Sequence, residues 1–359
     1  MAYKKLTLSP ESLVYTGDYV NEPLSIEVYA SKDGDLDIQN FDRSQLNKAL
    51  KILARSPNRA WVNIVGLNDI EAIAEIGKAL QMDPLFVEDI LNVQQRSKYE
   101  EGQKYVFMTM KMLMKQGFVT RKKRRVDSLE IQQEHISMII KDNLIVTFQE
   151  NPEDVFASIR DAFSKGGHIL SRGVDYWAYL MMDAIVDHQL ALMADMADLL
   201  DGFETALLDT KRLDLEGLYI LRKSLLKIKR ASYPLKDIFA MCINVNNPAF
   251  SSETITYLHD VDDHLNHVIE QHEHYRDIIA NLFEMHATEA SNRMNRIMTT
   301  LTVFSAVFIP LNFLAGFFGM NFKHFAMLDA PSGIPLFIVG SGILSVILVL
   351  IFKRIKWLA

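Results

Sequence analysis

Residues 297–318 read IMTTLTVFSAVFIPLNFLAGFF, and residues 334–352 read IPLFIVGSGILSVILVLIF. Neither stretch contains a charged side chain, and about 20 apolar residues are enough for a helix to cross a bilayer. Because only a short loop joins them, the two stretches predict a helical hairpin whose flanks lie on the same side of a membrane. The chain is therefore expected to be a multi-pass protein of a lipid bilayer, with nearly all its polar residues on one side.

The basic residues beside these stretches predict which side that is. Lysine and arginine flank the hairpin at Arg293, Arg296, Lys353, Arg354 and Lys356. The loop between the stretches carries only Lys323. Because Lys and Arg are enriched on the cytoplasmic side of membrane proteins, both termini are expected in the cytoplasm. The first residues lack the long apolar core of a signal peptide, which favours a location in the cell (inner) membrane with the soluble part never exported.

The length, the cysteine content and the absence of enzyme motifs limit the possible architecture and chemistry of the chain. About 300 residues precede the first apolar stretch, enough for one sizeable soluble domain and an extended element. Cys242 is the only cysteine, which excludes an intrachain disulfide and a cysteine-based metal site. The sequence contains no Gly-rich phosphate loop, nucleophile elbow or Cys/His pair, so an enzyme is the poorest interpretation.

The first 150 residues predict an α/β domain, a mixed sheet with flanking helices. Alternating apolar positions predict strands at residues 24–29, 61–65, 105–110, 136–140 and 144–148. Lys141-Asp142-Asn143 separates the last two strands and predicts a hairpin turn. Residues 69–82 have the amphipathic pattern of a helix, and Asp83-Pro84 supplies the N-cap and first position of another.

One strongly basic run, Arg121–Arg125, lies between two strand-like segments. The favoured interpretation is a solvated hairpin tip, and the sharper alternative is a contact with anionic lipid or nucleic acid. No aromatic residue is interleaved with the five charges. The run is therefore weak support for nucleic-acid binding, and no nucleic-acid partner is expected.

From about residue 176 the pattern becomes helical. Apolar residues recur at helical spacing over 175–208 and over 213–239, where Pro234 predicts a break. Residues 251–309 contain neither Gly nor Pro and predict a stalk helix that continues to residue 318 and would be ~100 Å long. Its apolar positions recur at roughly heptad spacing: Ile255, Leu258, Val261, Leu265, Val268, Tyr275, Ile278, Leu282 and Met285. A lone helix of this length would be marginally stable, so the stripe is interpreted as packing against copies of the chain, in a homo-oligomer.

These patterns divide the chain into six segments. The expected division is a cytoplasmic α/β and helical domain at 1–250, the cytoplasmic part of the stalk helix at 251–296, a first transmembrane, pore-lining helix at 297–318, an external loop at 319–333, a second transmembrane helix at 334–352 and a basic cytoplasmic tail at 353–359. Gly319-Met320-Asn321 would then lie at the mouth that faces away from the cytoplasm.

This tripeptide directly after the first span, together with the long stalk and the basic tail, resembles the CorA magnesium transporters, the two-transmembrane group with a Gly-x-Asn motif. Likeness to the soluble domain of that family is found at residues 12–17, 87–93 and 148–150. The resemblance covers nearly the whole chain. It implies a funnel-shaped homopentamer that conducts divalent cations, chiefly Mg²⁺ and often Co²⁺ and Ni²⁺.

One face of the first span predicts a pore lining. Its members recur in steps of three or four: Asn295, Met298, Leu301, Ser305, Ile309, Asn312 and Gly316. The Asn and Ser side chains can bond to the water shell of an ion, and the Met, Leu and Ile side chains can narrow and dewet the path. A polar residue in a span can also simply bond a neighbouring helix. A membrane-tethered coiled-coil adaptor, however, would not explain polar rings that alternate with apolar ones.

Asn321 is the predicted selectivity residue, and Gly319 and Met320 complete the predicted filter. Mg²⁺ gives up its water reluctantly, and a ring of neutral amide oxygens can hold the hydrated ion without stripping it. Gly319 permits a tight turn, and Met320 is expected to pack because sulfur is a poor ligand for a hard cation. Asn321 could also act as a helix C-cap, and the two roles are compatible.

Two departures from the family pattern bear on the ion. Phe318 stands where the family usually has tyrosine, and Lys323 and His324 replace an acidic collar, which leaves Asp329 as the only carboxylate of the loop. Zinc-transporting relatives also lack an acidic loop, so the alternative is a Zn²⁺ transporter of the same fold, with or without coupling to protons. The spans hold no ionisable side chain, which favours a channel driven by membrane potential over a proton-coupled carrier.

Acidic residues share helix faces in two places. Asp183 and Asp187 are four residues apart, and a second face carries Asp260, Asp263, His264 and His267. Six of the ten histidines lie between residues 259 and 286. Because three of them, His267, His272 and His274, do not share one face well, a polar stalk surface is favoured over a Zn²⁺ or Ni²⁺ site.

The family resemblance also implies a regulatory metal site. Asp89 of one subunit would face Asp260 of the next, and Glu88 and Asp183 would form a second site nearby. Mg²⁺ between these carboxylates would hold the subunits in a closed ring when cytoplasmic Mg²⁺ is high. The ordinary alternative for each residue is a solvated carboxylate on a helix.

Overall fold

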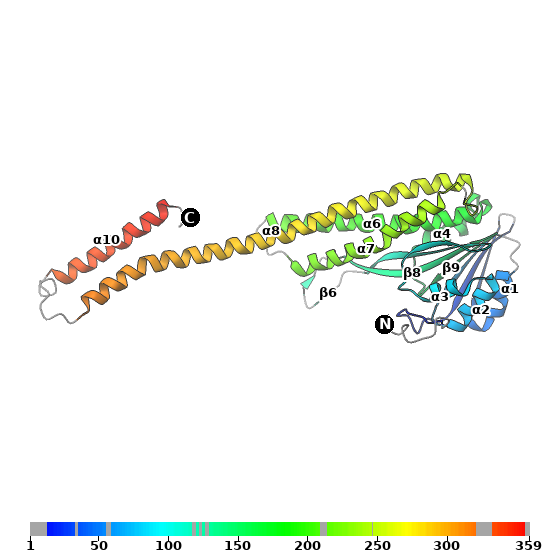
Figure 1. The fold of residues 1–359 in the computed structure, drawn as a ribbon, viewed down its shortest axis with the longest axis horizontal. Helices are drawn as coiled ribbons and strands as arrows, with labels where there is room; N and C mark the ends of the chain where they lie inside the picture. The colour runs from blue at the N-terminus through cyan, green and yellow to red at the C-terminus, as the bar shows by residue number, and fades with distance from the viewer. Residues whose placement is uncertain are drawn as a thin grey trace. The chain divides into compact units, whose positions relative to one another are not determined.

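The computed structural model contains two compact units, Met1–Ala280 and Asn281–Ala359 (Figure 1). It describes residues 13–32, 35–54, 59–116, 120–121, 124–125, 129–208, 214–245, 247–320 and 332–355. The first unit holds a mixed sheet with flanking helices, which is the α/β domain that the sequence predicts.

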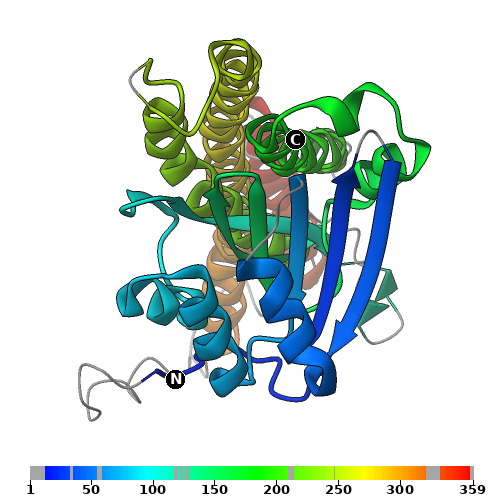
Figure 2. The ribbon, with the colours of Figure 1, turned by 90° about the vertical axis from the view of Figure 1, so that its right-hand side faces the viewer.

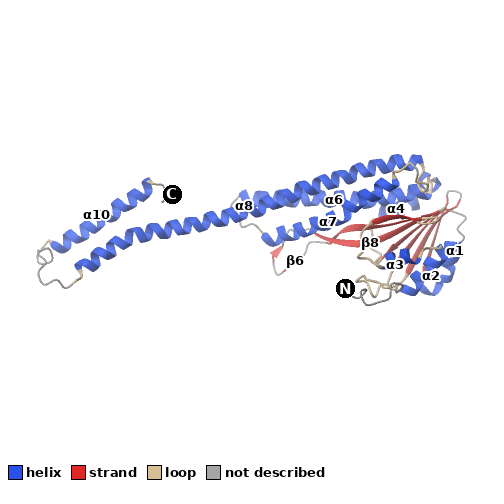
Figure 3. Cartoon of the chain, in the orientation of Figure 1, coloured by secondary structure: helices blue, strands red, loops and turns tan. Residues whose placement is uncertain are grey.

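A seven-stranded sheet forms the centre of the first unit (Figure 3). Its strands, in spatial order, are β2 (Asp35–Asp42), β1 (Ser25–Lys32), β3 (Arg59–Val65), β9 (Leu144–Gln149), β8 (Glu130–Lys141), β5 (Val106–Gln116) and β4 (Lys98–Glu101). β3 and β9 pair in parallel, and the other neighbours pair antiparallel. The five predicted strands are confirmed as β1, β3, β5, β8 and β9. The predicted turn between β8 and β9 is also confirmed, with Asp142 at a positive φ of 48°.

Two short strands, β6 (Thr120–Arg121) and β7 (Arg124–Arg125), pair with each other between β5 and β8. They carry Arg121, Arg124 and Arg125 in a strand pair, which agrees with the predicted hairpin, while the middle of the basic run lies outside the described residues.

The helices of the first unit follow local sequence signals. They are η2 (Arg43–Gln45), α1 (Leu46–Ala54), α2 (Ile70–Leu80), α3 (Pro84–Leu91), α4 (Ala157–Lys165), α5 (His168–Ser171), α6 (Val174–Leu208), α7 (Leu215–Cys242) and the first part of α8 (Ser252–Phe318). Asp69 accepts a hydrogen bond from the N–H of Ala72 and caps α2. Asp83 caps α3, and Pro84 occupies its first turn, as the sequence predicts.

The sheet separates two hydrophobic cores. The first core lies between the sheet and α1–α3, and it includes Ile26, Val62 and Ile76. The second lies between the sheet and the helices from α4 to α8, and it includes Trp61, Met181 and Leu265. Figure 2 shows the same arrangement, with the blue and cyan helices on one side of the strands and the green and yellow helices on the other. The two carboxylate sets of the predicted regulatory site therefore start from opposite faces of the sheet.

The predicted break at Pro234 is wrong. α7 continues through this residue to Cys242, and Pro234 is buried. Proline removes one N–H and costs about 3 kcal/mol inside a helix. The cost is offset because α7 packs across β4, β5 and β8 and buries apolar side chains before and after the proline, such as Leu225 and Ile238.

The apolar stripe of the stalk helix also behaves differently from the prediction. Leu258, Val261 and Leu265 are fully buried in the core that α6 and α7 share with the sheet. The stripe was expected to pack against copies of the chain, but in the first unit it packs against helices of its own chain. Heptad spacing cannot distinguish these two partners, because either one covers the same face of a helix.

The second unit holds the rest of α8 and the helix α10 (Gly333–Arg354). Both helices contain windows long and apolar enough to cross a membrane, and these windows are 6% and 0% buried. The ring of Phe318 lies 5.1 Å from that of Phe337 on α10. Helices therefore cover both predicted spans, and their apolar side chains are largely uncovered within the described residues.

Candidate pore and regulatory site

The seven residues of the predicted pore face lie on an exposed side of α8. All seven are exposed, and Met298, Leu301 and Ile309 keep 52%, 66% and 67% of their surface. Val303, in contrast, is buried. At about 100° per residue, Val303 lies nearly opposite the centre of the predicted face. The described helix therefore leaves this face open to other partners.

The helix ends where the predicted filter begins. The N–H of Gly319 donates to the carbonyl of Ala315 at 2.9 Å, and the N–H of Met320 donates to that of Phe317 at 3.3 Å. A Cβ at position 319 would lie 3.1 Å from the Ala315 carbonyl oxygen, so glycine suits this close approach. Met320 is 57% exposed. Asn321 and the loop to residue 331 lie outside the described residues.

On α3, Asp89 already has a cationic partner. The Lys98 ammonium donates to Asp89 Oδ2 at 2.7 Å and to Glu100 Oε1 at 2.8 Å. Burial raises the pKa of Asp89, and the bond from Lys98 opposes this effect. A metal ion at Asp89 would therefore compete with Lys98 for the carboxylate. Glu88 is half-buried on the same helix.

A second acidic group joins α6 to α8. Ligand atoms of Asp183, Asp187 and His264 all lie within 4.8 Å of one another. Burial, and next the charge of Asp187, raise the pKa of Asp183 to about 6, and Asp260 also contributes. His264 Nδ1 lacks a hydrogen-bond partner among the described residues. Two carboxylates and an imidazole at this spacing form a set of donors suited to a divalent cation.

The predicted site residues are thus only partly brought together. Asp260 is close enough to Asp183 for its charge to help raise the pKa of Asp183, whereas Glu88 and Asp89 start from the other face of the sheet. The sequence grouped Asp183 with Asp187, but only the packing of α6 against α8 adds His264 to them. The signal for this was present, because His264 shares a helix face with Asp260 at a spacing of four.

A buried polar group on β5 and β8 was not singled out from the sequence. Glu134 Oε1 accepts the N–H of Glu150 at 2.7 Å, and its Oε2 accepts Asn151 Nδ2 at 2.6 Å. Burial, and next the charge of Glu150, raise the pKa of Glu134 to about 8. On the neighbouring strand, burial lowers the pKa of Lys111 to about 8. Burial also lowers the pKa of His135 well below its ordinary value.

The raised pKa of Glu134 makes the stability of the fold depend on pH. Its folded pKa is about 8 against an ordinary value of 4.5, so its stabilising effect is complete below pH 4.5 and is lost as the pH rises through 8. Glu134→Gln mimics the neutral form, and we expect its stability to rise relative to wild type between about pH 6 and pH 8. The difference in the free energy of unfolding between the two proteins should grow by at most about 1.4 kcal/mol per pH unit. Thermal melts of the full chain in detergent, followed by the fluorescence of the buried Trp61 and Trp177, measure this difference.

Glu153→Gln is the matched control for this measurement, because Glu153 is an exposed carboxyl that lies two residues after Asn151, a partner of Glu134. Its stability relative to wild type should change little with pH. A difference between Glu134→Gln and wild type that stays constant across this range would contradict a neutral, buried Glu134.

The fold and the site together define a class of protein: a two-span membrane protein with a large α/β domain and one helix that continues from that domain into the first span. Residues 60–354 match the sequence profile of a family described as "CorA-like Mg2+ transporter protein". The chain is 31% identical over 358 residues to the "Cobalt/magnesium transport protein CorA" of Thermotoga maritima, covering 99% of this chain and 98% of that protein. The chain therefore belongs to the CorA-like Mg²⁺ transporter family.

Two further proteins are similar to this chain, one by sequence and one by structure. The "Zinc transport protein ZntB" of Yersinia pseudotuberculosis is 24% identical over 186 residues, which are 52% of this chain and 57% of that protein. The structure titled "The complete structure of CorA magnesium transporter from Methanocaldococcus jannaschii" superimposes with a TM-score of 0.75 at 17% identity, covering 93% of this chain and 98% of the other. This superposition confirms the predicted fold. The family is one of transporters, not of enzymes.

Proposed function

We propose that this chain forms a homopentameric channel that conducts Mg²⁺, with Co²⁺ and Ni²⁺ as further substrates, into the cytoplasm. The observation that carries the proposal is the match to a cobalt/magnesium transport protein over nearly the full length of both chains. Pore formation needs several copies, since one pair of helices encloses no path for an ion. The uncovered apolar surface of α8 and α10 is available for bilayer and neighbouring subunits.

The proposed topology follows the six segments expected from the sequence. Residues 297–318 and 334–352 span the membrane, residues 319–333 lie outside, and the N-terminal domain, the stalk to residue 296 and the tail from residue 353 lie in the cytoplasm. The lysines and arginines that flank the spans support this orientation. An inward membrane potential would then drive cations toward the cytoplasmic domain.

In the proposed pore, Asn321 selects the hydrated ion, with Gly319 and Met320 at its mouth. The exposed face of α8 lines the path. Asn295, Ser305 and Asn312 contact the water shell of the ion, while Met298, Leu301 and Ile309 form the constrictions that dewet on closing. Gly316 leaves room near the outer end. The alternation of polar and apolar residues at this spacing supports the assignment.

The proposed regulation uses cytoplasmic Mg²⁺ bound between subunits at Asp89, Asp260, Glu88 and Asp183. Two carboxylates about 4 Å apart repel by about 4 kcal/mol at an effective dielectric constant of 20. A divalent cation bound between them would replace this repulsion with attraction to both carboxylates. Each such metal bridge between two subunits is called a clamp here, and the clamps would hold the ring of subunits closed. Because α3 and α8 lie on opposite faces of the sheet within one chain, a second chain is needed to bring Asp89 to Asp260. The raised pKa of Asp183 supports an uncompensated acidic group there.

A Zn²⁺ transporter is the second candidate. The observation that favours it is the external loop, in which Lys323 and His324 leave a single carboxylate, Asp329. Such a loop attracts divalent cations less than an acidic one does. Similarity to a zinc transport protein covers only about half of the chain, so Mg²⁺ remains the first proposal.

Ion flux into proteoliposomes tests the two candidates. We expect an imposed membrane potential without a pH gradient to drive Mg²⁺ uptake, because the spans hold no ionisable group to carry a proton. Uptake is measured with a Mg²⁺-sensitive dye inside the vesicles and a Zn²⁺-sensitive dye in a parallel set. Protein-free vesicles under the same potential are the control. Zn²⁺ uptake that requires a pH gradient, together with little Mg²⁺ uptake, would contradict the magnesium proposal.

A further inference from the structure

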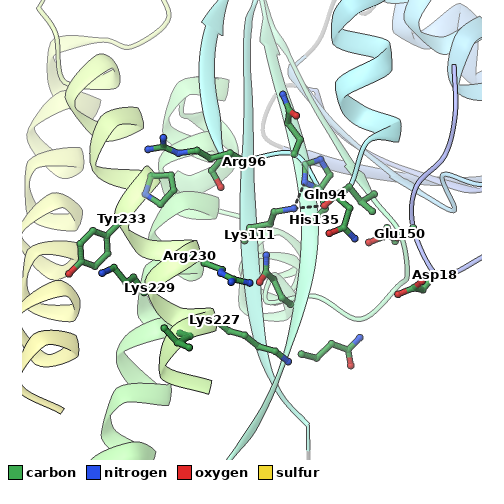
Figure 4. Close-up of a pocket in the computed structure, with 18 of the residues that line it drawn as sticks. Asp18, Gln94, Arg96, Lys111, His135, Glu150, Lys227, Lys229, Arg230 and Tyr233 are labelled. Atoms are coloured by element: carbon green, nitrogen blue, oxygen red, sulfur yellow. Dashed lines mark hydrogen bonds between the residues drawn. The ribbon is translucent and has the colours of Figure 1, made fainter. Parts of the chain in front are cut away.

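A cavity of about 920 Å³ opens in the first unit between α7 and the sheet (Figure 4). No residue of the proposed pore or regulatory site lines it. Its charged lining residues are five bases and two acids: Arg96, Lys111, Lys227, Lys229, Arg230, Asp18 and Glu150. The excess of positive charge indicates an anionic ligand.

The bases reach the cavity from both of its walls. Figure 4 shows Lys227 and Arg230 extending from α7 toward the strands that carry Lys111 and His135. Among the described residues, Arg230 forms no hydrogen bond or ion pair. Its planar guanidinium, with five N–H donors, is suited to two oxygens of a phosphate group.

Two buried groups of the sheet side still have capacity for a ligand. The Lys111 ammonium is bonded to the carbonyl of Val93 at 2.5 Å and to His135 Nδ1 at 3.0 Å. This uses two of its three N–H donors. Ser97 is only 5% exposed, and its Oγ has no hydrogen-bond partner in the described structure. Because a buried hydroxyl without a partner is unfavourable, an acceptor oxygen in the cavity would satisfy it.

The rest of the lining suits an organic group. Amide side chains that can bond to hydroxyls or to the edge of a base lie at Gln94, Gln95, Gln116, Gln132 and Gln133. Apolar surface for a flat ring is offered by Leu226, Tyr233 and Pro234. A cavity of this volume is in the range that holds a small organic molecule, larger than an inorganic ion alone.

We propose that this cavity binds a phosphate monoester of the size of a nucleoside monophosphate. Arg230, Lys111 and Ser97 hold the phosphate, and the glutamine amides and Tyr233 hold the organic part. A divalent cation is not the ligand, because the bases outnumber the acids and Glu150 already accepts the hydroxyl of Tyr15 at 2.6 Å. Tyr233 also bonds to Glu273 on α8, so the occupied cavity is connected to the stalk helix.

Calorimetric titration of the full chain in detergent, at one fixed salt concentration, tests this site. The probes are adenosine 5′-monophosphate, inorganic phosphate and adenosine. We expect the monophosphate to bind most tightly, phosphate more weakly and adenosine not measurably. Arg230→Ala should weaken binding of the monophosphate by about tenfold or more, because it removes a charge-assisted bond. Arg222→Ala removes the same charge from an exposed position of α7 outside the cavity and should leave the affinity unchanged.

Three results would overturn the inference. Equal affinity for the monophosphate and for phosphate would exclude the ester and its organic contacts. No saturable binding of either probe would exclude the site. An equal loss of affinity in Arg222→Ala and Arg230→Ala would mean that anion binding depends only on the net charge of the protein. The titration measures no ion flux, so its result does not depend on the proposed transport.

Discussion

Replacing Asn321 with alanine is expected to reduce potential-driven Mg²⁺ uptake by about 100-fold or more. The substitution removes one amide oxygen from every subunit at the proposed filter, and each bond to a charged group is worth about 1.5–3 kcal/mol. Loss of one such bond changes an equilibrium constant by about tenfold. The effect is larger here because every subunit loses its bond at once. The measurement is the initial rate of Mg²⁺ uptake into proteoliposomes at equal amounts of reconstituted protein.

Met320→Leu is the matched control for this substitution. It alters the adjacent residue, keeps an apolar side chain of similar size, and should leave uptake near the wild-type rate, because Met320 is proposed to pack and not to bind the ion. Wild-type rates in Asn321→Ala would contradict the assignment of the filter. A large loss in Met320→Leu would mean that the shape of the mouth matters more than its amide ring.

Replacing Asp260 with alanine is expected to raise, by about tenfold or more, the cytoplasmic Mg²⁺ concentration that half-closes the channel. The carboxylate is a proposed ligand in each clamp, and removing one charged ligand costs at least about 1.4 kcal/mol per site. Asp260 is exposed on α8, so the fold should tolerate the change. The rate of uptake is measured in vesicles preloaded with a series of Mg²⁺ concentrations.

Asp277→Ala serves as the control, because Asp277 is an exposed carboxylate of the same helix that pairs with Arg276. It should close at the wild-type concentration. If Asp260→Ala also closes there, the carboxylates do not form the regulatory clamp, whereas the pore proposal would stand.

Most of the fold follows from local chemistry that a sequence displays. The strands β8 and β9 are set by alternation and by a turn at Asp142, and α2 and α3 are set by the caps Asp69 and Asp83. The edge strands β2 and β4 were not predicted, because Asn40 breaks the alternation of β2 and because β4 has only four residues, three of them charged. Pro234 was misjudged because its local penalty is visible in the sequence, while the packing of α7 on three strands is not.

The candidate site shows the same contrast between local sequence signals and contacts made by distant segments. Spacing along one helix is enough to propose the face from Asn295 to Gly316, which stays a prediction because the apolar window of α8 is only 6% buried as a whole. Contacts between distant segments could not be predicted in this way. The pair of Asp89 and Lys98, the group of Asp183 with His264, and the cavity between α7 and the sheet each depend on how separate elements pack.

The two edges of the sheet limit how copies of this chain can assemble. β2 carries Asp35, Asp37 and Asp42 along a largely exposed edge strand, and β4 at the other end has only four residues, of which three are charged. Acidic and short edge strands discourage the addition of further strands. Neighbouring chains would therefore meet through helices and not through a shared sheet, and subunits could slide or tilt against one another without breaking any backbone ladder.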